Sequence, residues 1–149
     1  MKILSWNCRG LGQPRTVQEL VCLSKTHQPN VIFLSETRKN KDYVERLRYR
    51  LGMSNVFTYS SPGKGGGLAV FWDDSYTIQP NKYGEHFIDM YICTDNGAKW
   101  ISTFVYGEAK ASQRYVMWEL LGRIKPLGSG PWFLVGDFNE AMWQNEHFS

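Results

Sequence analysis

The chain has 149 residues, of which 42% are apolar and 15% aromatic, so we expect one domain with a sizeable core. Six tryptophans and only 21% charged residues exclude an intrinsically disordered chain. The 17 basic and 14 acidic residues give a net charge of +3, which permits a polyanionic partner without requiring one. The longest apolar runs are far shorter than the roughly 20 residues of a membrane-spanning helix.

The N-terminus and the cysteines both indicate an intracellular protein. The first residues, MKILSWN, turn polar too early to supply the apolar segment of a secretory signal, and a nuclear location is compatible with this. Three cysteines, Cys8, Cys22 and Cys93, form no Cys-x-x-Cys pair and are odd in number. This pattern argues against disulfides and a zinc knuckle and favours reduced, buried thiols.

Short apolar runs alternate with amphipathic stretches in the first part of the chain. Residues 3–6 predict a strand, and residues 31–34 predict a second strand that is covered on both faces, because all four residues are apolar. Between them, Thr16 and Glu19 predict a capping box at the start of a helix that ends near His27.

A basic stretch follows the second predicted strand. It holds six of the 17 basic residues, namely Arg38, Lys39, Lys41, Arg46, Arg48 and Arg50. Val44, Leu47 and Leu51 keep helical spacing beneath them and predict a helix. The favoured interpretation is a solvated helix face whose side-chain stems pack along the core, and the alternative is a face that contacts phosphates.

After Gly52 the pattern becomes that of strands separated by turn residues. The predicted strands are residues 56–59, 68–72, 76–79, 87–93 and 100–106. A helix from about Ser112 to Ile124 and a strand over residues 132–135 follow. The buried face of that helix is expected to consist of Met117, Trp118, Leu121 and Ile124. Several consecutive strands in the middle indicate stacked α and β layers rather than a purely parallel sheet.

Polar residues follow four of the predicted strands at the point where each ends. They are Asn7, Glu36, Tyr106, Asp137 and Asn139. If these strand ends share one rim, the side chains converge in a cleft, and an extended segment would direct Asp137 and Asn139 to the same face. Each residue alone is ordinary loop chemistry, but their joint occurrence favours a site. Oxygen ligands without a neighbouring histidine favour Mg²⁺, Mn²⁺ or Ca²⁺ over zinc.

Five motifs in this order resemble those of the endonuclease/exonuclease/phosphatase family. They are SWNCRG (residues 5–10), LSETR (34–38), GGLAVFW (66–72), FVYG (104–107) and GDFNE (136–140). The resemblance is to the AP-endonuclease-like domain of plant LINE-type retrotransposon proteins in particular, and Arg114 with Trp118 and the pair Pro131-Trp132 are similar to that subgroup. It implies an α/β/β/α sandwich of the DNase I-like type, of which this chain is the N-terminal portion.

The resemblance also implies Mg²⁺-dependent hydrolysis of phosphodiester bonds in DNA. Glu36 would be the principal ligand of Mg²⁺, or of Mn²⁺ in its place, with Asn7 beside it. Tyr106 would contact the scissile phosphate or the leaving oxygen. Asp137 would orient or help deprotonate the attacking water, and Asn139 would steady the transition state. Three arginines would contact the nucleic acid: Arg9, Arg38 and Arg114.

One departure from the family pattern concerns its C-terminal motifs, which include an Asp-His pair after a serine. The 149 residues contain no such pair, and we expect His27, His86 and His147 to be structural or surface histidines. Lack of a general acid/base would lower the rate on the order of 10²–10⁴-fold. Missing C-terminal strands and a missing helix would leave an open sheet edge, through which the chain could self-associate.

The sequence leaves three functions open. The first is a DNA endonuclease that nicks the backbone. The second is a catalytically inactive remnant that binds nucleic acid or its own copy, which the missing Asp-His pair motivates. The third is a phosphatase that acts on small phosphoesters.

Overall fold

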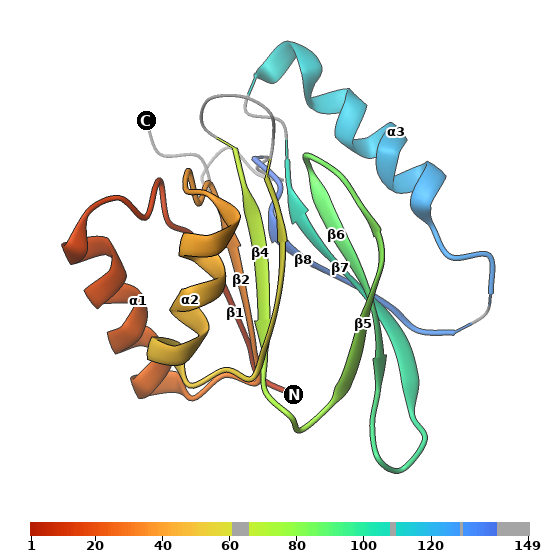
Figure 1. The fold of residues 1–149 in the computed structure, drawn as a ribbon. Coiled ribbons are helices and arrows are strands. Elements are labelled where there is room, and N and C mark those ends of the chain that lie inside the picture. Colours follow the sequence, from red (N-terminus) through yellow and green to blue (C-terminus); the bar gives the residue numbers. More distant parts are fainter. Residues whose placement is uncertain (61–65, 108–109, 129, 140–149) are drawn as a thin grey trace.

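Two four-stranded β-sheets packed face to face form the centre of the protein. The structure is a computed structural model, and it describes residues 1–60, 66–107, 110–128 and 130–139. Helices α1 (Pro14–His27) and α2 (Lys41–Leu51) cover the outer face of one sheet, and helix α3 (Arg114–Ile124) covers the other (Figure 1). The predicted α/β/β/α layering is confirmed.

The first sheet has the strand order β1-β2-β4-β3. Its strands are β1 (Ile3–Asn7), β2 (Val31–Ser35), β3 (Asn55–Tyr59) and β4 (Leu68–Trp72). β1 and β2 are parallel, so Asn7 pairs with Ser35 where both strands end. Side chains of β2 alternate between the helical layer, which receives Leu34, and the opposite sheet, which receives Phe33. This explains why an uninterrupted apolar run forms the strand.

The second sheet has the strand order β5-β6-β7-β8. Its strands are β5 (Thr77–Tyr83), β6 (Phe87–Cys93), β7 (Lys99–Tyr106) and β8 (Trp132–Asp137). β7 and β8 are parallel, and Tyr106 pairs with Asp137 at their ends. β1 lies against β8, so the two parallel pairs are neighbours across the sandwich. Each pair therefore delivers its polar terminal residues to the same region.

The core between the sheets sets their spacing. It includes Phe33 and Phe104, whose rings lie 5.4 Å apart, together with Val70 and Met90. All four are fully buried or nearly so. Burial of apolar surface contributes about 25 cal/mol per Å², so this layer is a major source of stability and holds the sheets in register.

Helix α1 begins earlier than predicted, and the predicted capping box is wrong. The helix starts at Pro14 with Gln13 as N-cap, and no side chain caps it. Proline suits the first helical position because its φ is preset and it has no N–H to satisfy. Thr16 is consequently already inside the first turn. Asn40, in contrast, caps α2 by accepting a hydrogen bond from the Tyr43 backbone N–H at 2.9 Å.

Two further predictions need correction. Trp118 is predicted on the buried face of α3 but is 53% exposed. Met117, Leu121 and Ile124 turn toward the sheet, and Trp118, which follows Met117, points about 100° away from that direction. Strand β5 extends to Tyr83, beyond its predicted end at residue 79, because an edge strand tolerates proline at Pro80 and β5 shifts register between Pro80 and Tyr83.

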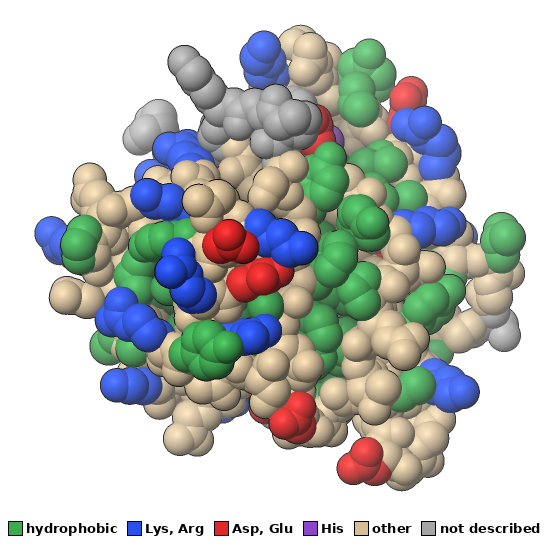
Figure 2. All heavy atoms as spheres, viewed as in Figure 1, with side chains coloured by type: hydrophobic (Ala, Val, Ile, Leu, Met, Phe, Trp, Pro, Cys, Tyr) green, Lys and Arg blue, Asp and Glu red, His purple; other side chains and the backbone are tan. Residues whose placement is uncertain are grey.

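The part of the basic stretch that lies in α2 forms a solvated helix face, as favoured from the sequence, whereas Arg38 and Lys39 precede the helix. Figure 2 shows Lys and Arg side chains spread over the α1 and α2 layer, with acidic side chains among them. Two ion pairs link residues one turn apart, Arg15 with Glu19 and Lys41 with Glu45. Exposed pairs of this kind contribute only a few tenths of a kcal/mol, so their main effect is on solubility.

The three cysteines differ in exposure, which corrects the prediction of three buried thiols. Cys8 is 5% exposed, Cys93 is half-buried and Cys22 is exposed. No helix in the described part of the chain is long and apolar enough to cross a membrane.

We expect alkylation to separate the three thiols. Burial raises the pKa of Cys8 to about 11, and its Sγ donates to the Ser35 carbonyl at 3.1 Å, so little reactive thiolate forms at pH 8. Iodoacetamide should therefore label Cys22 first and Cys8 only after unfolding. Peptide mass spectrometry of native and urea-treated protein measures this, and equal native labelling of Cys8 and Cys22 would contradict the burial of Cys8.

Candidate active site

Polar side chains from the ends of β1, β2, β7 and β8 meet at one edge of the sandwich. The Tyr106 hydroxyl donates to Glu36 Oε1 at 2.5 Å. Asn7 Nδ2 donates to Asp137 Oδ2 over a longer 3.5 Å. Both contacts cross from one sheet to the other, so the structure places Asn7, Glu36, Tyr106 and Asp137 together. We call these four residues the cross-sheet cluster.

Glu36 is largely shielded from solvent, with 16% of its side chain accessible against 48% for the neighbouring Arg38. Its Oε2 accepts from Arg38 Nη2 at 3.1 Å, so each carboxylate oxygen has a donor. The residue has a left-handed backbone with φ 54°, which costs a non-glycine residue about 1–2 kcal/mol. Its carbonyl accepts from the Gly10 N–H at 2.7 Å, which helps to keep this conformation in place.

The double glycine before β4 supports the loop that carries Glu36. The carbonyls of Gly67 and Gly66 accept from the N–H groups of Thr37 and Arg38 at 3.2 and 3.1 Å. Gly67 has φ +117°, and a Cβ there would lie 2.1 Å from Thr37 Oγ1. The GGLAVFW motif therefore contributes backbone contacts rather than a side chain to the site.

Asp137 and Asn139 do not lie on one face of an extended segment, which corrects the prediction. β8 ends at Asp137, and Asn139 has a left-handed φ of 51°. Asp137 Oδ1 accepts from the Asn139 backbone N–H at 2.9 Å, a local turn typical of aspartate. The Asn139 side chain donates to the Gly107 carbonyl at 2.8 Å. Asn139 thus holds the loops around Asp137 and does not contact the cross-sheet cluster with its amide.

Tyr106 is held as a neutral phenol. Burial raises its pKa above the ordinary value for tyrosine, and the hydrogen bond to Glu36 and the charges of Glu36 and Asp137 raise it further. Two nearby carboxylates disfavour a phenolate, because it would add a third negative charge. The hydroxyl therefore remains a proton donor at neutral pH.

His86 borders this tyrosine, although the sequence indicated only a structural or surface histidine. Its ring stacks on Tyr106 with centroids 6.5 Å apart. The signal that could have located it is the strand pairing, since His86 precedes β6 directly opposite the end of β7. His27 is the exposed last residue of α1. His147 and Glu140, the last residue of the GDFNE motif, lie outside the described residues.

The three predicted nucleic-acid contacts occupy different places. Arg38 lies beside Glu36 with 48% of its side chain exposed. Exposed Arg9 donates its backbone N–H to Asn7 Oδ1 at 3.0 Å. Arg9, Arg38 and Lys39 line a depression of about 450 Å³ whose described lining contains no acidic residue. Arg114 is half-buried at the start of α3, one turn before Trp118, which stacks on Phe138 at 5.9 Å.

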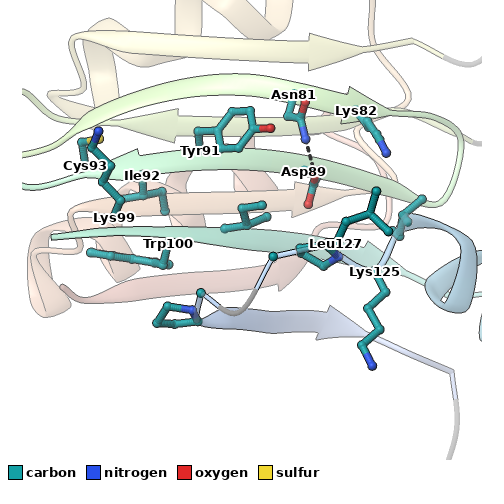
Figure 3. Close-up of a pocket in the computed structure, with 16 residues that line it drawn as sticks. Asn81, Lys82, Asp89, Tyr91, Ile92, Cys93, Lys99, Trp100, Lys125 and Leu127 are labelled. Atoms are coloured by element: carbon teal, nitrogen blue, oxygen red, sulfur yellow. Dashed lines mark hydrogen bonds between the residues drawn. The ribbon is translucent and has the colours of Figure 1, made fainter.

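A larger groove of about 610 Å³ lies elsewhere, on the outer face of the second sheet (Figure 3). Its floor includes the buried Asp89, which accepts hydrogen bonds from Thr103 and Asn81 at 2.5 and 2.9 Å. None of the predicted site residues lines it. Its volume alone does not make it the active site.

The cross-sheet cluster offers oxygen ligands that suit a hard divalent cation. Two carboxylates and an amide oxygen are the donor types that Mg²⁺ and Mn²⁺ prefer. Glu36 and Asn7 are the residues that would hold such an ion. No group of three or more His, Cys, Asp or Glu side chains arranged for metal binding occurs among the described residues.

The model of the endonuclease/exonuclease/phosphatase family matches residues 4–149. The chain belongs to this family. A search of curated proteins gave no match. Among solved structures, D. rerio TDP2 complexed with single-strand DNA product is similar with a TM-score of 0.69 and 19% identity over 95% of this chain and 61% of that one.

Two other solved structures share the fold of this chain. AP endonuclease LMAP from Leishmania major has a TM-score of 0.61 and 16% identity, over 91% of this chain and 54% of that one. ANGEL2, a 2',3'-cyclic phosphatase in complex with adenosine-2',3'-vanadate, has a TM-score of 0.63 and 12% identity, over 95% and 54%. The chain thus spans between half and two thirds of these three structures.

Replacing Gly136 by alanine should disrupt the position of Asp137. Gly136 has φ +143°, and a Cβ would lie 2.0 Å from the Val105 carbonyl oxygen, so Gly136→Ala should destabilise the fold by more than about 2 kcal/mol. Gly122→Ala is the matched control. Gly122 lies in α3 with nothing near its Cβ position, so alanine should stabilise by about 0.5–1 kcal/mol. Urea unfolding measures both, and equal effects would contradict this account.

The raised pKa of Tyr106 predicts a loss of stability at high pH. The folded state holds the Tyr106 proton more tightly than the unfolded state, so its contribution is complete below about pH 10 and decreases as pH rises further. Wild type should therefore lose unfolding free energy more steeply above about pH 10 than Tyr106→Phe does. Denaturant titrations at several pH values measure this. Parallel curves for the two proteins would show that Tyr106 titrates normally.

Proposed function

We propose that the chain hydrolyses phosphodiester bonds of DNA with Mg²⁺, or Mn²⁺ in its place, as the N-terminal part of a retroelement-type endonuclease domain. The observation that carries the proposal is the cross-sheet cluster, in which Tyr106 contacts Glu36 and Asn7 contacts Asp137. Phosphodiester hydrolysis mainly needs charge neutralisation and fixed donors, and this cluster combines two carboxylates with an amide and a hydroxyl.

Each member of the cluster has a proposed role. Mg²⁺ bound by Glu36 and Asn7 would supply Lewis-acid stabilisation of the phosphate charge. With a cation on Glu36, the neutral Tyr106 hydroxyl would turn its single proton from Glu36 to a phosphate or leaving oxygen, while the ring keeps its place. Asp137 orients or deprotonates the attacking water, and the Asn139 N–H fixes its Oδ1. The Asn139 amide would steady the transition state after it leaves the Gly107 carbonyl.

DNA is the proposed partner of this site. The D. rerio TDP2 structure contains a single-strand DNA product, and LMAP is an AP endonuclease. Arg9, Arg38 and Lys39 around the depression beside Glu36 would contact backbone phosphates, and Arg114 is a further proposed contact. Binding should then weaken steeply with salt. Self-association through an open sheet edge stays a prediction, as does a nuclear location.

Small phosphoesters are the alternative substrate class. The similarity to ANGEL2, a 2',3'-cyclic phosphatase, supports this alternative. Parallel assays on supercoiled plasmid and on soluble phosphomonoesters separate the two classes. Salt-sensitive DNA binding without metal-stimulated cleavage would instead favour the inactive, nucleic-acid-binding chain.

We expect Glu36→Gln and Asp137→Asn each to reduce plasmid nicking by about 10²-fold or more, because each removes a charge from the cross-sheet cluster with little change in shape. Agarose-gel nicking rates with and without Mg²⁺ measure the loss. Glu19→Gln is the matched control, since Glu19 is exposed on α1 and pairs only with Arg15 among the described residues. Equal nicking by wild type and both site variants would refute the assignment.

A further inference from the structure

His86 lies directly opposite Tyr106, one step past the regular pairing of β6 with β7. Phe87 pairs with Val105 in the antiparallel ladder. The Tyr106 backbone N–H donates to the His86 carbonyl at 2.8 Å and extends the ladder by one residue pair. The two side chains therefore start from neighbouring backbone positions at the edge where the cross-sheet cluster lies.

Two side-chain contacts add to this backbone bond. His86 Nδ1 lies 2.9 Å from the Tyr106 carbonyl oxygen. A carbonyl only accepts, so Nδ1 carries the proton, and it does so in both the neutral and the protonated ring. The imidazole also stacks on the phenol with an interplanar angle of 26°. His86 thus contacts both the backbone and the ring of Tyr106.

These contacts matter because the Tyr106 hydroxyl must reach across to the other sheet. Its partner, Glu36, lies on the loop after β2, and a small rotation of the phenol would separate the two groups. The apolar core between the sheets holds the inner part of the tyrosine ring. At the rim of the sandwich, His86 contacts both the backbone carbonyl and the ring of Tyr106 and so limits the rotation of the phenol.

We propose that His86 is a positioning residue, whose donated hydrogen bond and stacked ring hold Tyr106 so that its hydroxyl stays on Glu36. The inference rests on the proposed function in so far as Tyr106 takes part in phosphodiester hydrolysis. Its first test is therefore independent of catalysis.

Two substitutions separate the hydrogen bond from the stacking. His86→Asn keeps an N–H donor at the position of Nδ1 and removes the ring, whereas His86→Phe keeps a ring and removes the donor. His86→Ala removes both. We expect the hydrogen bond to contribute more than the stacking to the position of Tyr106. The hydrogen bond fixes His86 against the Tyr106 carbonyl, whereas a single ring contact at a half-exposed edge lets the two rings slide past each other. His27→Phe, at the exposed end of α1, is the matched control.

The first measurement is ¹⁹F NMR of the chain labelled with 3-fluorotyrosine, with Tyr106→Phe identifying the Tyr106 signal among the eight tyrosines. The signal should shift or broaden in His86→Ala and His86→Phe and remain near its wild-type position in His86→Asn and His27→Phe. A signal unchanged in His86→Ala, or displaced as far in His86→Asn as in His86→Phe, would overturn the proposal. If His86→Ala does not fold, the Asn and Phe variants still decide.

The second measurement is the plasmid-nicking rate of the same variants. His86→Phe should lower kcat roughly tenfold to a hundredfold with little change in KM, because misplaced catalytic groups cost rates of this size, and His86→Asn should restore most of it. Equal loss in both variants would contradict the donor's role. Wild-type rates for Glu36→Gln and Tyr106→Phe would refute the proposed function, while the NMR result would still decide whether His86 positions Tyr106.

Discussion

The hydrogen bond between Tyr106 and Glu36 joins the two sheets, and the rest of the site depends on the spacing that permits it. Packed sheets lie about 10 Å apart, so side chains from opposite sheets meet only if both point into the gap or past its rim. The tilted ring pair of Phe33 and Phe104, fully buried between the sheets, helps to maintain this gap. The Asn7–Asp137 contact uses the same gap. A change in the apolar layer would therefore alter the geometry of the polar edge.

Charge balance explains how Glu36 remains in place with little solvent access. A carboxylate that loses water needs compensating donors, and here Arg38 and Tyr106 supply one to each oxygen. The two donors differ, since Arg38 is half-exposed and Tyr106 is held by strand pairing and by His86. A cation at Glu36 would make the arginine contact dispensable, whereas the tyrosine would keep its position. Such a cation would replace one positive partner of Glu36 by another.

Much of the fold could be predicted from the sequence, because each buried strand is an apolar run and each helix has a regular apolar spacing. Strands β2, β4 and β6 agree with their predicted limits within one residue. The failures have two causes: the local preference of Pro14 for the first helical turn moves the start of α1, and the edge position and register shift of β5 let this strand continue through Pro80. Trp118 is apolar but occupies a position that turns away from the sheet, where it stacks on Phe138 instead.

The candidate site was predictable in residue type and only partly in geometry. Strand-end positions were sufficient to bring Asn7, Glu36, Tyr106 and Asp137 together, since parallel neighbours end on the same side. The turn at Asn139 and the place of His86 were not predictable, because both depend on which strands pair.

Backbone strain at this edge of the sandwich is the feature of the site that is hardest to predict from the residue types. Among the described residues, five non-glycine residues have positive φ, and four of them, Arg9, Glu36, Arg38 and Asn139, lie at the site. Arginine and glutamate have no local preference for this conformation, which costs about 1–2 kcal/mol for each residue. Hydrogen bonds from neighbouring loops offset the cost, as the Gly66 carbonyl does for Arg38. The strain therefore persists only while the sandwich is intact, which ties the shape of the candidate active site to the stability of the whole fold.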